Sequence, residues 1–389
     1  MALIDSVRYF TEEKHILSCM SVVCGTAGQT SQALGGTRDL AGHPVTEDTI
    51  FDLASLTKLV TGLLCFRLRE EGLLDLAAPV TRYAPGYREL SDVSVDRVLG
   101  FEIALITPQR VDAQPDAETG LRMLYQIQPR PLGNGRAYSD MHAMVLRHIL
   151  EGASGQSYME LFRSRLAGPL GLKDMDCHVA QPERCASCDR EHRIEKGRYI
   201  LRDGIAPGTP HDPKQRLLYP DGSACAGHAG LFGTIGDVAA LAQGVLRGEV
   251  VSDESLRRMA QNRTGHLLPD GSWTQFLGSQ CYVRHPVQYH SEIPEYESDR
   301  AIGVSGFTGH HLSIDPERGI FVCYLGDRVL DRLSVLVPEE GKTREDYGLS
   351  ADGSGQVRWP DGSLVWSSVD YVHQKDEHFH REVRRELML

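Results

Sequence analysis

The chain has 389 residues, 41% of them hydrophobic, so it can bury a large core and is long for a single domain. Its formal net charge is −12 and it has no long basic run, which argues against nucleic acid or an anionic membrane surface as a partner. No apolar stretch is long enough to cross a bilayer, and residues 1–24 lack the basic start and apolar core of a signal peptide.

Strand patterns open the chain after a polar, partly helical start over residues 1–14. Residues 16–24 and 29–35 resemble two strands, and the segment 25–28 between them contains two glycines. We expect these strands to begin a sheet.

A buried helix is predicted to begin at Ser55. The run 59–68 is apolar nearly all round, and Gly72 marks the helix end. Residues three apart share a helix face, so Ser55 and Lys58 are expected to lie together in the interior. A serine becomes a good nucleophile when a base accepts its proton, and burial can lower a lysine pKa enough for this. The structural alternative is a capping serine beside a lysine that reaches solvent.

The middle of the chain, about 73–265, alternates helical segments with proline-broken loops, and we interpret it as a helical insertion into the sheet. Tyr138 and Asp140 stand at the entrance of a second predicted helix, 141–152.

Strand patterns return at 279–285, 310–315 and 320–326, which predicts that these segments complete the sheet beside the N-terminal pair. Three glycines within 303–309 indicate backbone that another group must approach closely. A hairpin around 360–362 and a charged helix follow.

Three short motifs occur in an order and spacing that resemble those of a known superfamily. They are Ser55-x-x-Lys58, Tyr138-Ser139-Asp140 and the glycine-flanked Val304-Ser305-Gly306. Together they resemble the serine β-lactamase and penicillin-binding-protein superfamily, in the branch that includes esterases, D-amino-acid peptidases and transacylases. The phrases at 211–213 and 227–233 are also similar to segments of that branch.

The resemblance implies an α+β fold: a central antiparallel sheet flanked by helices, with an inserted all-helical subdomain and the active site between them. It covers a domain over residues 1–333. The extension 334–389 lies outside it, and we expect the extension to pack on the domain or to form a contact between copies of the chain.

The resemblance also implies catalytic roles. Ser55 attacks a carbonyl carbon, while Lys58 and Tyr138 manage its proton and that of the leaving group. The N–H groups of Ser55 and Phe307 form the oxyanion hole. No cofactor is implied.

Substrate binding is assigned by the same resemblance to Asp140, Ser305, Gly306 and Phe307, with Asp140 bonding Lys58 or a substrate amide. The family usually has lysine or histidine at the position of Val304, where the cation binds a substrate carboxylate. Valine favours a small ester, amide or peptide substrate without a carboxylate at that point, or acyl transfer. A β-lactamase or DD-carboxypeptidase is the alternative.

Two histidines on the predicted strand, His310 and His311, offer a replacement for the missing cation, although strand histidines are more often simply solvated. The rival functional class is a member of the family that binds a ligand without turnover, and Val304 is its best support.

Nine scattered cysteines, an odd number, are typical of reduced thiols in a cytoplasmic protein. Cys177, Cys185, Cys188 and His192 are candidate zinc ligands, but their irregular spacing favours a loop with free thiols, and we expect no metal.

Overall fold

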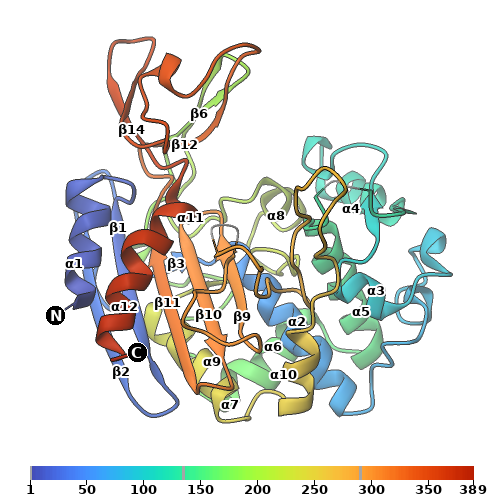
Figure 1. Ribbon diagram of the computed structural model, residues 1–389. Coiled ribbons are helices and arrows are strands. Elements are labelled where there is room, and N and C mark those ends of the chain that lie inside the picture. The colour runs from blue at the N-terminus through green and yellow to red at the C-terminus, as the bar shows by residue number, and fades with distance from the viewer. Residues whose placement is uncertain (1, 134–135, 289–290) are drawn as a thin grey trace.

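The structure is a computed structural model that describes residues 2–133, 136–288 and 291–389. Its larger sheet has five antiparallel strands in the order β2-β1-β11-β10-β9 (Figure 1). These strands are β1 (Cys19–Thr26), β2 (Thr30–Gly36), β9 (Ile302–Gly306), β10 (His310–Asp315) and β11 (Ile320–Gly326). The two N-terminal strands therefore lie beside strands from the far end of the chain, as predicted.

Successive side chains of β1 point to opposite faces of the sheet and so belong to two separate core clusters. Cys19 and Val23 face the large cluster around the central helix, whereas Met20 and Val22 face a second cluster. That second cluster lies under α1 (Ala2–Arg8), α11 (Tyr371–Gln374) and α12 (His380–Glu386). The sheet is thus buried on both faces, with the terminal helices side by side on one of them (Figure 1).

Helix α2 (Leu56–Glu70) lies on the opposite face of the sheet and is buried along nearly its whole length. It contacts α5 (Asp140–Ser154), and this packing sets the starts of the two helices near each other. The other helices are α3 (Val95–Leu99), α4 (Ala117–Tyr125), α6 (Tyr158–Phe162), α7 (Gly168–Leu170), α8 (Pro213–Leu218), α9 (Ile235–Leu246) and α10 (Asp253–Met259). None of the helices in the described part of the chain has the length and apolar content to cross a membrane.

A second sheet projects beyond one end of the first (Figure 1). Its strand order is β13-β14-β12-β6-β7, with β6 (Glu191–Glu195), β7 (Arg198–Arg202), β12 (Arg332–Val337), β13 (Gln356–Arg358) and β14 (Leu364–Ser367). The hairpin expected around 360–362 is present; its strand β14 pairs with β12, and β12 pairs with β6 from the middle of the chain. The proposed domain boundary at residue 333 stays a prediction, and β12 runs across it.

Two short pairs complete the strands: β3 (Phe51–Asp52) with β8 (Phe232–Gly233), and β4 (Ala104–Ile106) with β5 (Gln128–Arg130). The strand predicted at 279–285 is wrong. That segment is a buried loop that touches β9 through a single bridge between Tyr282 and Gly303. Gln280 has φ of 58°, and this left-handed residue interrupts the extended run.

Candidate active site

Ser55 lies at the start of α2, directly after a backbone turn that is fixed by three hydrogen bonds to Asp52. Ala54 has φ of 45°, a left-handed conformation that is unfavourable for alanine. The buried Asp52 carboxylate accepts hydrogen bonds from the Ala54 N–H (3.0 Å) and the His211 N–H (2.6 Å). The main-chain carbonyl oxygen of Asp52 accepts a third hydrogen bond, from the Thr308 hydroxyl (2.8 Å). Asp52 therefore fixes the turn that carries Ser55, a role that the motifs did not indicate.

Lys58 is fully buried one helical turn after Ser55. Its ammonium Nζ donates to Ser55 Oγ at 2.8 Å and to the His228 carbonyl oxygen at 3.2 Å, and it lies 2.8 Å from Asp140 Oδ1. The expected proximity of Ser55, Lys58 and Asp140 is therefore present.

The expectation that burial lowers the pKa of Lys58 is not met. Burial does act in that direction, but the charge of Asp140 and the hydrogen bond to Tyr138 outweigh it and raise the pKa of Lys58. The same ion pair holds the pKa of Asp140 well below its usual range, although burial alone would raise it. Lys58 is therefore a cation in the resting site, and it is no free base.

Tyr138 is held by aromatic stacking. Its ring lies between those of Phe101 and Tyr282, with centroids 5.6 Å and 5.3 Å away. Its backbone N–H donates to Gln275 Oε1 at 3.0 Å. The Lys58 ammonium sits 4.9 Å from the ring centre, so cation and phenol share one corner of the site.

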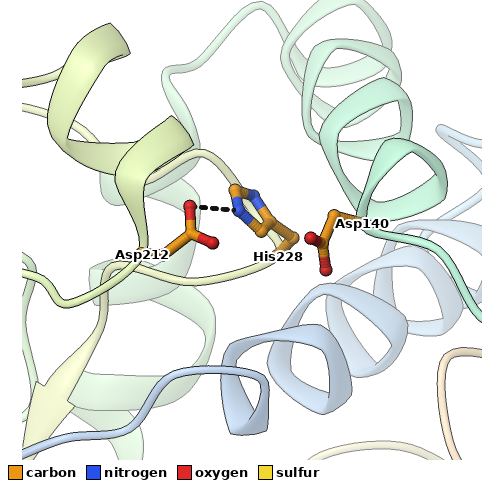
Figure 2. A group of neighbouring side chains, drawn as sticks. All are labelled: Asp140, Asp212 and His228. Atoms are coloured by element: carbon orange, nitrogen blue, oxygen red, sulfur yellow. Dashed lines mark hydrogen bonds and ion pairs between the residues drawn. The ribbon is translucent and has the colours of Figure 1, made fainter. Parts of the chain in front are cut away.

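Behind this corner, Asp140, Asp212 and His228 converge from the start of α5, the start of α8 and the loop before β8 (Figure 2). Among the described residues, they are the group whose ligand atoms are close enough to hold a metal ion. However, Lys58 pairs with Asp140, and Lys214 Nζ lies 3.0 Å from Asp140 and 3.3 Å from Asp212. Because protein cations already neutralise both carboxylates, the cluster does not fit a divalent metal.

The zinc ligands considered from the sequence do not assemble among the described residues. Cys177 Sγ donates to the Gly222 carbonyl oxygen, and His192 pairs with Asp331 at 3.0 Å. Burial also raises the pKa of the Cys185 thiol to about 12, so this cysteine is a buried neutral thiol.

A cavity of about 290 Å³ opens over Ser55. Tyr138, Asp140 and Phe307 are among its lining residues, together with His211 and four arginines that the motifs did not indicate. The Phe307 ring stacks on the His211 ring, with the ring centroids 5.3 Å apart.

Strand β9 contributes little to this cavity. Val304 is 1% exposed and belongs to the main core. The Ser305 hydroxyl donates to Glu292 Oε2 at 2.6 Å, and the Gly306 carbonyl oxygen accepts from the Tyr371 hydroxyl at 2.9 Å. Neither residue is part of the cavity lining. Substrate binding by Ser305 and Gly306 stays a prediction.

The two histidines of β10 are not solvated. Both are buried, and burial lowers the pKa of each to about 4. His310 Nε2 lies 2.6 Å from the Asp52 carbonyl oxygen and so helps to hold the turn before Ser55. Near neutral pH neither histidine carries the positive charge that Val304 lacks.

Comparison with known proteins identifies the family of the chain. A family model described as Beta-lactamase matches residues 5–331. The chain is 33% identical to esterase EstB of Burkholderia gladioli over 230 residues, which are 51% of this chain and 57% of that esterase. It is 26% identical over 319 residues to a putative D-alanyl-D-alanine carboxypeptidase of Salmonella enteritidis PT4, covering 74% of this chain and 72% of the relative.

Among solved structures, D-amino acid amidase of Ochrobactrum anthropi SV3 superimposes with a TM-score of 0.67. The alignment covers 100% of both chains at 17% identity. At this identity the likeness shows the fold alone.

Proposed function

The chain belongs to the Beta-lactamase family, whose members are serine hydrolases, and from this premise we propose that it cleaves an ester or amide through an acyl-enzyme on Ser55. The observation that carries the proposal is the contact of 2.8 Å between Ser55 Oγ and the buried Lys58 ammonium, at the floor of an open cavity. Nucleophile, cation and phenol come from two helix starts that pack together.

In the first step, Ser55 Oγ forms a bond to the substrate carbonyl carbon, and the bond to the leaving oxygen or nitrogen breaks. Because Lys58 is already protonated, the phenol of Tyr138 relays the proton. Its oxygen accepts the Ser55 proton while its own proton passes to the leaving atom. The ammonium of Lys58 stabilises the negative charge that develops on both oxygens, and the N–H groups of Ser55 and Phe307 stabilise the oxyanion.

In the second step, an acceptor attacks the acyl carbon and Ser55 leaves. Water gives hydrolysis, and an amine or alcohol gives acyl transfer. The same relay runs in reverse: the acceptor's proton enters through Tyr138, and Ser55 Oγ recovers a proton. Esters and amides with small acyl groups suit the cavity volume of about 290 Å³.

A member that only binds its ligand is the less favoured reading, since Ser55, Lys58 and Tyr138 are all present and in contact. The apolar Val304 argues against recognition of a β-lactam or a terminal D-alanine by strand β9. A cytoplasmic location and self-association through residues 334–389 stay predictions.

Steady-state hydrolysis of p-nitrophenyl butyrate tests the proposal. We expect Ser55→Ala to lower kcat/KM by on the order of 10⁴-fold, because residual catalysis then rests on binding and the oxyanion hole alone. An unchanged melting temperature in the variant separates lost chemistry from lost folding. Retention of most of the activity in folded Ser55→Ala protein would show that another nucleophile acts.

A further inference from the structure

Four arginines surround the cavity over Ser55, on a chain whose net charge is −12. Two of them come from the β6–β7 hairpin of the projecting sheet, and two come from loops of the middle region. They are Arg110, Arg136, Arg193 and Arg202. Clustered guanidinium groups at a concave site focus a positive potential there, whatever the sign of the whole chain.

The carboxylates of the cavity do not cancel this charge. Asp140 and Asp212 are the acidic residues of its lining, and both are paired with the ammonium groups of Lys58 and Lys214. The floor of the cavity is therefore close to neutral by itself, and the charge of the arginines has to be balanced elsewhere.

Two of the four arginines are hydrogen-bonded to carboxylates of the protein. Arg110 lies 2.5 Å from Asp112. Arg193 pairs with Glu191 at 2.9 Å and with Glu195 at 2.8 Å. Arg110 donates to Asp112 through Nε and Nη2, and Arg193 donates to Glu195 and Glu191 through Nε and Nη1. The charge of each guanidinium group is therefore already matched by a carboxylate of the protein.

The other two have unused donors. Arg136 lies over the ring of Tyr138 at 5.4 Å, and none of the described carboxylates pairs with it. Arg202 is 3.7 Å from Glu191 Oε2, an oxygen that the His211 ring contacts at 3.0 Å. No hydrogen bond to either guanidinium is present within the described residues. The Arg202 side chain is 39% exposed, so its donors are accessible.

We propose that Arg136 and Arg202 bind a carboxylate of the substrate, so that Ser55 acts on an ester or amide whose acyl or leaving part carries an anionic group. The reaction in this inference rests on the proposed function of Ser55. The choice of ligand rests on the two arginines of the cavity lining alone. Guanidinium groups bind carboxylates through two parallel hydrogen bonds, which fixes orientation as well as charge. This moves recognition of the substrate's charge away from strand β9, where Val304 is apolar and buried.

Two esters that differ only at the far end of the acyl chain test this. In mono-p-nitrophenyl adipate a carboxylate replaces the terminal methyl of p-nitrophenyl hexanoate, so leaving group and chain length are matched. We expect the wild-type protein to show the higher kcat/KM with the adipate ester, and the preference to shrink at high ionic strength.

Arg136→Gln and Arg202→Gln should each lower kcat/KM for the adipate ester about tenfold or more relative to kcat/KM for the hexanoate ester. Arg257→Gln on α10, an exposed arginine paired with Asp253, is the matched control and should change neither. A preference for the hexanoate ester, or an equal loss with both esters in the arginine variants, would overturn the inference.

Binding without turnover separates this inference from the proposed role of Ser55. In Ser55→Ala protein, calorimetric titration with the adipate ester should give a Kd that rises about tenfold with Arg202→Gln added. This result stands even if another residue proves to be the nucleophile. Equal affinity with and without Arg202 would contradict carboxylate binding at the rim, even where Ser55-dependent hydrolysis is intact.

Discussion

The start of α2 lines the cavity and strand β9 lies outside its lining, and the two regions also differ in chemistry. At the start of α2, Ser55, Lys58 and Asp140 form a chain of short polar contacts. On β9, Val304 is packed in the core, and the Ser305 hydroxyl is bonded to Glu292. The groups proposed to move protons lie in one region, and the other region is packed into the core.

In the proposed function, the reaction and the recognition of substrate charge use different regions of the fold. The proton-moving groups depend on each other within a few ångströms and tolerate little change. A cation that only attracts a substrate charge can act from any wall of the cavity. The β6–β7 hairpin supplies such a wall, from a sheet that also contains part of the C-terminal extension.

The largest effect on stability is expected from Asp140→Asn. The change removes the carboxylate shared by Lys58 and Lys214 and leaves the buried Lys58 ammonium unpaired. We expect the free energy of unfolding to fall by about 3–5 kcal/mol, measured by urea denaturation at pH 7. Asp174→Asn removes a similarly exposed carboxylate that pairs with Arg184, and it should cost about 1 kcal/mol or less.

The pH dependence of that difference has a defined sign. Because the folded-state pKa of Asp140 lies well below its usual range, its stabilisation is complete above about pH 4 and is lost as pH falls further. The difference in free energy of unfolding between the wild-type protein and Asp140→Asn should therefore persist at pH 5 and decrease only at lower pH. Equal stability of the two proteins at pH 7 would show that the pair contributes nothing.

A smaller effect is expected from Val304→Ala on β9. The side chain is 1% exposed, so its truncation should lower the free energy of unfolding by about 1–3 kcal/mol. Val337→Ala, at a position 44% exposed, is the control and should change it by about 0.5 kcal/mol or less.

The rate of ester hydrolysis also distinguishes the start of α2 from strand β9. Val304→Ala should keep kcat/KM for p-nitrophenyl butyrate close to the wild-type value at a temperature where it is folded. A large loss of kcat/KM in stable Val304→Ala protein would mean that β9 takes part in recognition after all.

Much of the fold was predictable from the sequence because alternation and apolar runs report burial directly. Strands β10 and β11 have the bounds that the patterns at 310–315 and 320–326 predicted. The buried helix after Ser55 was equally clear. The strand prediction for 279–285 failed because buried loops and strands can have similar apolar composition. The left-handed backbone of Gln280, which interrupts the extended run, is not visible in the sequence.

The site was predictable where residues are close in sequence and poorly predictable elsewhere. Ser55 and Lys58 are joined by helical spacing. Asp52, by contrast, acts through atoms of His211 and Thr308, and no local pattern announces such contacts. The pKa of Lys58 was misjudged for a related reason: burial was visible in the sequence, but the opposing charge of Asp140 depends on packing between helices.

The central claim is that Ser55 is the nucleophile, and the most direct test is to map a covalent adduct. The protein is incubated with a fluorophosphonate probe, digested and analysed by mass spectrometry. We predict one adduct of defined mass on the peptide that contains Ser55, and no labelling of folded Ser55→Ala protein. A probe mass on a different residue, or equal labelling of the variant, would contradict the account.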